Sequence, residues 1–173
     1  VPIETLKSAV RDVPDFPEPG IVFKDITPIL SCPNLFSIAV ENMILSLGDV
    51  KIDKIVGIDA RGFIFGAAMA DRLKCGFTPA RKAGKLPWKT IQESYSLEYG
   101  EATLEMHEDA VKEGETVAIV DDLLATGGTS KVAANLVHRL GGKIHSISFF
   151  VELKFLPGRD VLKDFQVHSL LQY

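Results

Sequence analysis

The sequence predicts an α/β fold in which a central, mostly parallel twisted sheet is flanked by helices. Two stretches carry this prediction. In residues 52–82 and again in residues 115–153, a β-branched apolar run is followed by a helical pattern and then by a second apolar run. That alternation is typical of parallel strands joined by crossover helices. With 173 residues, of which 46% are hydrophobic, the chain is expected to form a single domain over residues 1–173.

The N-terminal part is expected to hold two helices separated by an irregular segment. Residues 3–12 predict a short amphipathic helix, and the prolines and glycine of residues 13–20 favour a shaped loop. Residues 21–26 are expected to be extended. Asn34 is then expected to cap a helix over residues 35–48, whose apolar residues recur at helical spacing.

The remaining elements follow from apolar runs and from glycines that end helices. The predicted strands and their crossover helices are strands 52–59, 77–82, 115–121 and 143–153 and helices 61–74 and 129–140. Residues 83–114 lack a strong period, apart from LEMHE at residues 104–108, which resembles a hairpin strand. A stretch of that length inside a compact domain is usually a functional loop or lid.

Composition argues against several classes of partner. The net charge of −4 gives no general attraction to nucleic acid or to anionic membranes, so a polyanionic ligand requires a local group of cations. No apolar run approaches the roughly 20 residues that a bilayer requires, and the first residues lack the apolar core of a signal peptide. Cys32 and Cys75 form no CxxC motif, which favours a reduced, cytoplasmic protein with two small apolar thiols.

The clearest functional pattern lies in residues 117–130, VAIVDDLLATGGTS, where an apolar strand leads through two acids into a Thr-Gly-Gly turn and a helix. Gly127 and Gly128 permit a close backbone approach, and the free N–H groups of the helix favour a phosphate. Asp121 and Asp122 fall at the carboxyl end of the strand, where ligands bind in open α/β sheets. Carboxylates at that place suit sugar hydroxyls or a metal ion.

Other sites are excluded or weakly indicated. There is no GxxxxGK[ST] and no GxGxxG after a strand, which excludes Walker-type hydrolysis and dinucleotide binding. An isolated Thr-Gly-Gly could be no more than a helix-capping turn, but the acid pair before it favours a ligand site. The histidines match no metal-ligand spacing and are expected to be structural or exposed; they are His107, His138, His145 and His168.

The acid pair and the ATGGT turn together resemble the phosphoribosyl-pyrophosphate signature of type I phosphoribosyltransferases. Three further blocks, in order and at consistent spacing, resemble the adenine branch of that family, namely FPEPGIVFKDITPIL, DARGFIFG and RKAGKLPWKTIQESYSLEYG. The final SLLQY resembles the end of eukaryotic members. The resemblance covers residues 14–173 and implies the type I phosphoribosyltransferase fold, with a small base-binding hood over residues 1–35 and a flexible catalytic loop over residues 84–100.

The resemblance implies a glycosyltransferase of purine salvage that moves the 5-phosphoribosyl group from phosphoribosyl pyrophosphate to N9 of adenine, releasing AMP and pyrophosphate. It also implies a homodimer, and Mg²⁺ that is carried by the substrate rather than by protein side chains. The implied residues for the donor are, for the 5-phosphate, Ala125, Thr126, Gly127, Gly128 and Thr129; for ribose, Asp121 and Asp122; and for pyrophosphate, Arg61, Arg81, Lys82 and Lys85.

For the base and the chemistry, the resemblance implies a backbone readout of adenine at Val22, Phe23 and Lys24, with the Phe23 ring stacked on the purine. Glu98, Tyr99 and Arg61 are the implied catalytic residues. A carboxylate at Glu98 could act as general acid or base and could also favour a cationic sugar. Arg81 is implied to reach the pyrophosphate of a neighbouring subunit.

Two departures and two alternatives remain. Lys24 stands where many relatives have Arg, and Trp88 stands where Gly is common, so Trp88 could stiffen the loop. One alternative is a non-catalytic regulator that senses phosphoribosyl pyrophosphate, although Arg61, Lys85 and Glu98 are all retained. The other is a transferase for another base, because a fold does not fix a substrate.

Overall fold

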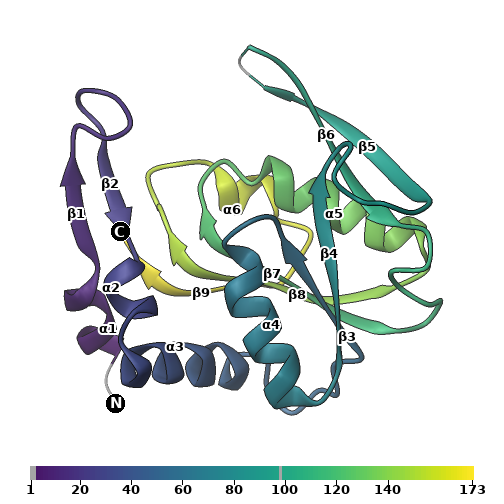
Figure 1. Ribbon diagram of the computed structural model, residues 1–173, viewed down its shortest axis with the longest axis horizontal. Helices are drawn as coiled ribbons and strands as arrows, with labels where there is room; N and C mark the ends of the chain where they lie inside the picture. Colours follow the sequence, from purple (N-terminus) through teal and green to yellow (C-terminus); the bar gives the residue numbers. More distant parts are fainter. Residues whose placement is uncertain (1–2, 98) are drawn as a thin grey trace.

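The structure is a computed structural model that describes residues 3–97 and 99–173 (Figure 1). The helices in chain order are α1 (Ile3–Ala9), α2 (Thr27–Leu30), α3 (Pro33–Leu45), α4 (Gly62–Leu73), α5 (Gly128–Arg139) and α6 (Gly158–Val161). The strands in chain order are β1 (Arg11–Pro14), β2 (Val22–Asp25), β3 (Lys54–Ile58), β4 (Gly76–Lys82), β5 (Thr90–Leu97), β6 (Gly100–His107), β7 (Thr116–Leu124), β8 (Lys143–Glu152) and β9 (Val167–Gln172).

A seven-stranded sheet organises the described residues, in the order β5-β6-β4-β3-β7-β8-β9. The five strands from β4 to β9 in that order pair in parallel, whereas β5 and β6 form an antiparallel ribbon at one end. β1 and β2 form a separate antiparallel hairpin. The sequence prediction of a mostly parallel α/β sheet is therefore confirmed.

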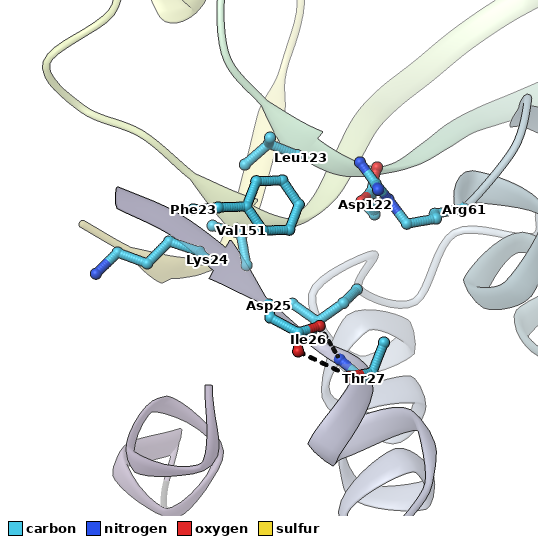
Figure 2. Close-up of a pocket in the computed structure, with 9 residues that line it drawn as sticks. All are labelled: Phe23, Lys24, Asp25, Ile26, Thr27, Arg61, Asp122, Leu123 and Val151. Atoms are coloured by element: carbon cyan, nitrogen blue, oxygen red, sulfur yellow. Dashed lines mark hydrogen bonds and ion pairs between the residues drawn. The ribbon is translucent and has the colours of Figure 1, made fainter. Parts of the chain in front are cut away.

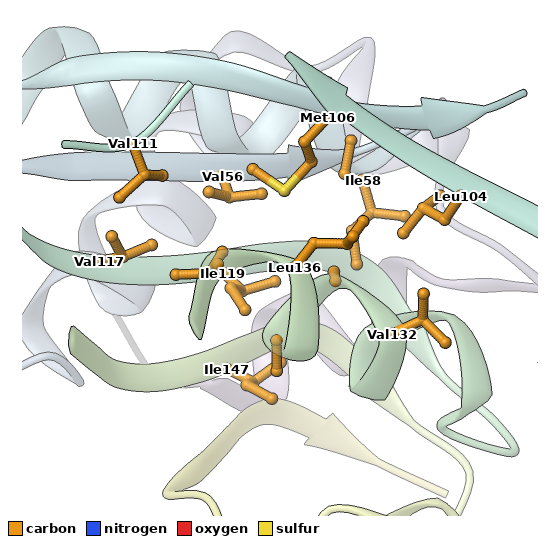
Figure 3. Close-up of a cluster of buried hydrophobic side chains, with 14 of the residues drawn as sticks. Val56, Ile58, Leu104, Met106, Val111, Val117, Ile119, Val132, Leu136 and Ile147 are labelled. Carbon is orange, nitrogen blue, oxygen red and sulfur yellow. The ribbon is translucent and has the colours of Figure 1, made fainter. Parts of the chain in front are cut away.

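Alternate residues of the central strands pack into two cores, because successive side chains of a strand point to opposite faces. Val117 and Ile119 of β7 join the core that α5 covers (Figure 3), whereas Ala118 and Val120 join the core that α3 and α4 cover. Both faces of the sheet are thus buried. Such burial explains the continuous apolar runs from which parallel strands were predicted.

Two N-terminal predictions were wrong in detail. The first helix ends at Ala9 rather than at residue 12, because the backbone of Arg11–Pro14 pairs with β2 as strand β1. The helix α3 begins at Pro33 after the N-cap Cys32, so Asn34 is inside the helix and does not cap it. Proline suits the first helical position because the missing N–H would have no partner there.

The predicted loop also contains regular structure that the sequence period did not reveal. Residues 84–100 include all of β5, whose pairing with β6 runs from Thr90↔His107 to Leu97↔Gly100. β5 is half exposed along its length, so its side chains do not follow a simple apolar alternation. Figure 1 shows this ribbon projecting beyond the sheet.

Candidate functional site

Most of the predicted site residues that the structure describes gather at the carboxyl edge of the parallel strands, where ligands bind in folds of this class. Asp59 follows β3 directly, and Asp121 and Asp122 lie near the end of β7. β7 extends to Leu124, beyond the predicted end at residue 121, because its pairing with β8 continues to Leu124↔Glu152. The acid pair therefore stands on a strand that is still paired with β8 at this level, beyond the last pair with β3 at Val120, rather than on a loop.

The Thr-Gly-Gly turn forms the expected cradle. A hollow of about 90 Å³ is lined by residues 123–130 together with Asp121, so the five predicted 5-phosphate residues surround one space. Gly127, with a φ of +84°, is the N-cap of α5, and no side chain caps the helix. The first turn of α5 has no acidic residue. Free N–H groups and the helix dipole at this point suit an anion.

The short helix α6 supports the cradle from behind through contacts between glycines. A Cβ atom at Gly127 would lie 3.0 Å from the carbonyl oxygen of Gly158, and one at Gly158 would lie 2.5 Å from that of Ala125. Neither position has room for a side chain. The packing of α6 therefore fixes the shape of the cradle, and the sequence pattern gave no signal of it.

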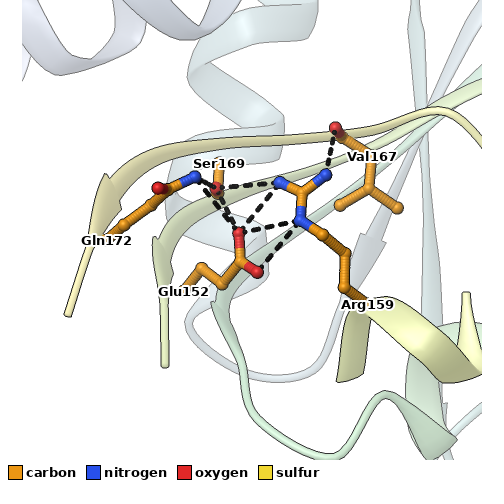
Figure 4. Close-up of polar contacts among 5 residues, drawn as sticks. All are labelled: Glu152, Arg159, Val167, Ser169 and Gln172. Atoms are coloured by element: carbon orange, nitrogen blue, oxygen red, sulfur yellow. Dashed lines mark hydrogen bonds and ion pairs between the residues drawn. The ribbon is translucent and has the colours of Figure 1, made fainter. Parts of the chain in front are cut away.

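An ion-pair network holds α6 to the sheet (Figure 4). Arg159 donates from Nη2 to Glu152 Oε1 at 2.9 Å and from Nε to Glu152 Oε2 at 3.0 Å. Ser169 on β9 donates to Glu152 Oε1 at 2.6 Å. The hydrogen bond from Arg159 lowers the pKa of the buried Glu152 below its ordinary value, against the opposing effect of burial.

The acid pair has an asymmetric environment. Burial and then the charge of Asp122 raise the pKa of Asp121 well above its ordinary value. Asp122 is ion-paired to Arg61, which Figure 2 shows beside it. Both acids line a hollow of about 370 Å³ together with Asp59 and Arg61. This hollow can take a polyol or a hydrated cation, because carboxylate oxygens bind hydroxyl groups and hard metal ions.

Three of the four predicted pyrophosphate cations are near one another. Arg81 donates to Asp59 at 2.9 Å, and Lys85 Nζ lies 3.9 Å from the same carboxylate. Arg61 is two residues beyond Asp59 and pairs with Asp122 instead. Lys82 follows Arg81 on the strand and points to the other face, so it is the member that the structure separates from the set.

Two of the three predicted base-binding residues, Phe23 and Lys24, border an apolar pocket of about 50 Å³ (Figure 2). Phe23 and Leu123 line it, and the Arg61 guanidinium lies 5.8 Å from the centre of the Phe23 ring. The Lys24 side chain points away from Phe23 and donates to Asp12 at 2.6 Å. Only the backbone of Lys24 is therefore free to face the pocket.

Val22 lies outside this pocket. Its side chain is 54% exposed and lines an adjoining apolar groove that also includes Ile21, Phe155 and Tyr173. A role for Val22 in base binding would thus have to come from its backbone. Leu123, by contrast, borders both the pocket and the acid-pair hollow.

The ribbon reaches the cradle through a residue that was not predicted. Tyr99 is 90% exposed near the ribbon tip, so the structure does not bury it in the site. Glu98 lies outside the described residues. The hydroxyl of Tyr95 instead lies 2.9 Å from the hydroxyl of Thr129.

Among residues 3–97 and 99–173, no group of three or more His, Cys, Asp or Glu side chains could hold a metal ion. The oxygen atoms of Asp121 and Asp122 fit a hard cation whose remaining ligands come from a phosphate substrate and water. No described helix is long and apolar enough to cross a membrane.

Sequence reasoning missed several residues of this site. Leu123 directly follows the acid pair, and Asp59 directly follows β3, so strand position alone could have indicated both. Tyr95 and Gly158 carry no such signal, because each reaches the cradle only through tertiary packing.

Comparison with known proteins agrees with this arrangement. Residues 30–159 match the family described as phosphoribosyl transferase domain. The chain is 52% identical to an adenine phosphoribosyltransferase of Kosmotoga olearia over 168 residues, which is 97% of this chain and 99% of the relative. It is 53% identical to that of an Anaeromyxobacter species over 171 residues, which is 99% of this chain and 97% of the relative.

Solved structures show the same similarity. The adenine phosphoribosyltransferase of Thermoanaerobacter pseudethanolicus superposes with a TM-score of 0.96 at 49% identity, covering 99% of this chain and 100% of that one. The Saccharomyces cerevisiae enzyme, solved with adenine and an imino-altritol bisphosphate, gives a TM-score of 0.92 at 40% identity, with 97% of each chain covered.

Proposed function

Because the chain belongs to the phosphoribosyltransferase family, we propose that it transfers the 5-phosphoribosyl group of phosphoribosyl pyrophosphate to adenine, releasing AMP and pyrophosphate in purine salvage. One observation carries the proposal: an uncapped helix N-terminus, a partly buried acid pair and an apolar aromatic pocket adjoin one another. These three features suit a phosphate, a sugar and a base in that order. Adenine is favoured over other bases by relatives at about half identity that carry this name.

In this proposal, the cradle of residues 125–129 binds the 5-phosphate, with backbone N–H groups and two threonine hydroxyls as donors. Asp121 and Asp122 accept hydrogen bonds from the ribose hydroxyls. Such contacts fix the anomeric carbon relative to the base. The reaction of two bound and oriented substrates then proceeds as an effectively unimolecular step.

The pyrophosphate leaves toward Arg61, Arg81 and Lys85, whereas Lys82, on the other face of β4, is left out of this set. Arg61 is near enough to the acid-pair hollow to act within its own chain. Arg81 is proposed to act in the site of a second copy, in a homodimer. Developing negative charge on the leaving group is stabilised by these fixed cations, which is the larger part of catalysis in such a site.

Adenine is proposed to bind between Phe23 and Leu123, under a hood formed by residues 1–35. The backbone groups of Val22 and Lys24 read the edge of the base. An aromatic face on one side and an aliphatic side chain on the other suit a flat purine. Mg²⁺ bound with the substrate would neutralise phosphate charge, with Asp121 and Asp122 as the protein groups nearest to it.

Residues 84–100 are proposed to close over the substrates and exclude water, with Glu98 and Tyr99 brought to the reaction centre. Glu98 would exchange a proton with a ring nitrogen of adenine and would favour positive charge on the sugar. Closure matters because water would otherwise trap the oxocarbenium-like sugar. A cytoplasmic setting is proposed as well, because Cys32 and Cys75 form no disulfide.

The test is AMP formation from adenine, phosphoribosyl pyrophosphate and Mg²⁺, with guanine, hypoxanthine and uracil in parallel. Product from adenine alone supports the proposal. Product from another base would show that this base is a substrate instead of, or besides, adenine. Binding of phosphoribosyl pyrophosphate without any product would favour a non-catalytic sensor. Glu98→Ala is expected to lower kcat far more than it weakens binding of phosphoribosyl pyrophosphate.

A further inference from the structure

The ribbon β5-β6 lies along α5 and is held there by three polar contacts. Asn135 donates to Glu93 at 2.7 Å, and Arg139 donates to the carbonyl of Gln92 at 2.8 Å. The third contact is the hydroxyl pair of Tyr95 and Thr129 at 2.9 Å. Only this last contact lies at the N-terminus of the helix.

Tyr95 is packed so that its hydroxyl has a defined place. Its half-buried ring packs against the core that α5 covers, and its ring edge lies 3.5 Å from where a Cβ of Gly128 would be. The contact therefore spans the ribbon and two neighbouring residues of the cradle. Among the described residues of the ribbon, no other side chain forms a hydrogen bond with residues 125–129.

Hydrogen-bond capacity determines what happens when the cradle is filled. A threonine hydroxyl has one proton to donate and two lone pairs to accept. When the Thr129 proton is donated to a phosphate oxygen, the Thr129 oxygen still accepts a proton from the Tyr95 hydroxyl. Both hydroxyl protons are then donated, from Tyr95 to Thr129 and from Thr129 to the phosphate, and hydrogen bonds in such a chain strengthen one another.

We propose that Tyr95 is a positioning residue that ties the ribbon to the phosphate-loaded cradle through Thr129. This inference rests on the proposed function, because it takes the cradle as the 5-phosphate site. Tyr95 lies only four residues before Tyr99 on the same ribbon. Its hydroxyl therefore links occupancy of the phosphate site to the placement of the segment that closes over the reaction centre.

The experiment compares wild type with Tyr95→Phe, which keeps the ring and removes the hydroxyl alone. We expect the KM for phosphoribosyl pyrophosphate and the Kd of ribose 5-phosphate to rise about three- to tenfold, the effect of one hydrogen bond. The KM for adenine should stay within twofold. Tyr173→Phe is the matched control, because it also removes one phenol hydroxyl, which donates to the carbonyl of Lys7 on α1.

A double-mutant cycle separates this link from simple loss of stability. Thr129→Val removes the acceptor, so adding Tyr95→Phe to it should weaken ribose 5-phosphate binding no further. Thr129→Ser keeps a hydroxyl at this position, so in that background Tyr95→Phe should again weaken ribose 5-phosphate binding. Asn135→Ala loosens the ribbon at the middle of α5 and should leave the Kd of ribose 5-phosphate within twofold.

The outcomes are distinguishable from those of the proposed function. If wild type makes no AMP and binds no ribose 5-phosphate, the proposed function fails and this inference fails with it. Suppose instead that wild type is active. If Tyr95→Phe then has the same Kd for ribose 5-phosphate as wild type, or if the effects of Tyr95→Phe and Thr129→Val on this Kd are additive, only the role of Tyr95 is overturned. An equal loss in Asn135→Ala also overturns it, since ribbon docking alone would then explain the effect.

Discussion

At the scale of single residues, Asp121 is where folding stability and ligand binding are expected to conflict. Burial and the nearby Asp122 raise its pKa, so the charged form destabilises the folded state at neutral pH. Asp121→Asn should therefore raise the free energy of unfolding by about 1 kcal/mol or more, one pKa unit being about 1.4 kcal/mol. Binding of phosphoribosyl pyrophosphate should weaken in the same variant.

Urea unfolding at several pH values checks this prediction. As the pH falls toward the raised pKa, folded wild type takes up the proton before the unfolded chain does, so wild type recovers stability and the difference shrinks. Asp71→Asn is the control, because that carboxyl is exposed. An Asp121→Asn protein that is less stable than wild type at pH 7 would contradict the argument.

Phe23 should govern affinity for the base. Phe23→Leu keeps an apolar side chain but removes the aromatic face, so the KM for adenine should rise about two- to tenfold. The KM for phosphoribosyl pyrophosphate should change little, since the cradle is formed by β7 and α5. Steady-state kinetics with each substrate varied in turn measures both, and equal rises in the two KM values would count against stacking.

Some site residues could be predicted from the sequence, and others could not. The cradle glycines and the acid pair could be placed because a strand, two acids and a helix start are contiguous in the chain. The ion-pair partners of the arginines could not be predicted in this way. Arg61 pairs with Asp122 and Arg81 with Asp59, over sequence separations of 61 and 22 residues, which only the parallel sheet brings together.

At the scale of elements, α6 should act as a support for the cradle. Arg159→Met removes the cation that holds Glu152 and should lower the free energy of unfolding by about 1–2 kcal/mol at pH 7, discounted because Arg159 is half exposed. The KM for phosphoribosyl pyrophosphate should also rise, since Gly158 packs against the cradle. Denaturant unfolding and kinetics measure the two effects.

The stability difference between wild type and Arg159→Met should depend on pH in a defined direction. The pKa of Glu152 is lowered in the folded protein, so its stabilising effect is full above the ordinary glutamate pKa and is lost as the pH falls through the folded value. The gap between wild type and Arg159→Met should therefore close in acid. Arg72→Met, which breaks contacts to Ser37 on α3, is the control and should leave the KM for phosphoribosyl pyrophosphate unchanged.

Elements were predictable where one period dominates. β3, α4 and α5 were placed within two residues, because each has one consistently buried face or is buried on both faces. β5 was missed because it is half exposed, and β1 was missed because its strand character comes from pairing with β2. Local pattern therefore carries little information about strands that a partner stabilises.

At the scale of the whole molecule, the proposed homodimer makes a prediction about mixed subunits. If Arg81 acts in the partner's site, Arg81→Ala and Asp122→Asn fall in the same site of a mixed dimer and leave the other site whole. Mixing the two inactive variants after reversible dissociation should restore about one quarter of the wild-type rate, from statistical reassortment of a symmetric dimer.

Activity measured against the mixing ratio checks this, with each variant alone as the control. Arg81 is held by Asp59 of its own chain in the structure, so the proposed action requires Arg81 to exchange partners. If mixing restores nothing while sedimentation shows mixed dimers, Arg81 acts within its own site.

The overall class of fold was predictable, and the arrangement of its strands was not. Crossover units identify a parallel sheet from sequence. The order β4-β3-β7-β8 brings Asp59 beside the acid pair, and this order depends on pairings between residues far apart in the chain. The site is therefore a product of topology as much as of motif.

When an anionic ligand binds at the strand ends, it must replace the aspartates that are ion-paired with the arginines there. Arg61 and Arg81 are each occupied by an aspartate, so a polyphosphate that attracts Arg61 displaces Asp122 and leaves that carboxylate facing it. A polyphosphate that arrives with its own divalent cation avoids this repulsion, and a bare one does not. We therefore expect the protein to bind a polyphosphate that carries a divalent cation more tightly than a bare one, before any bond is broken.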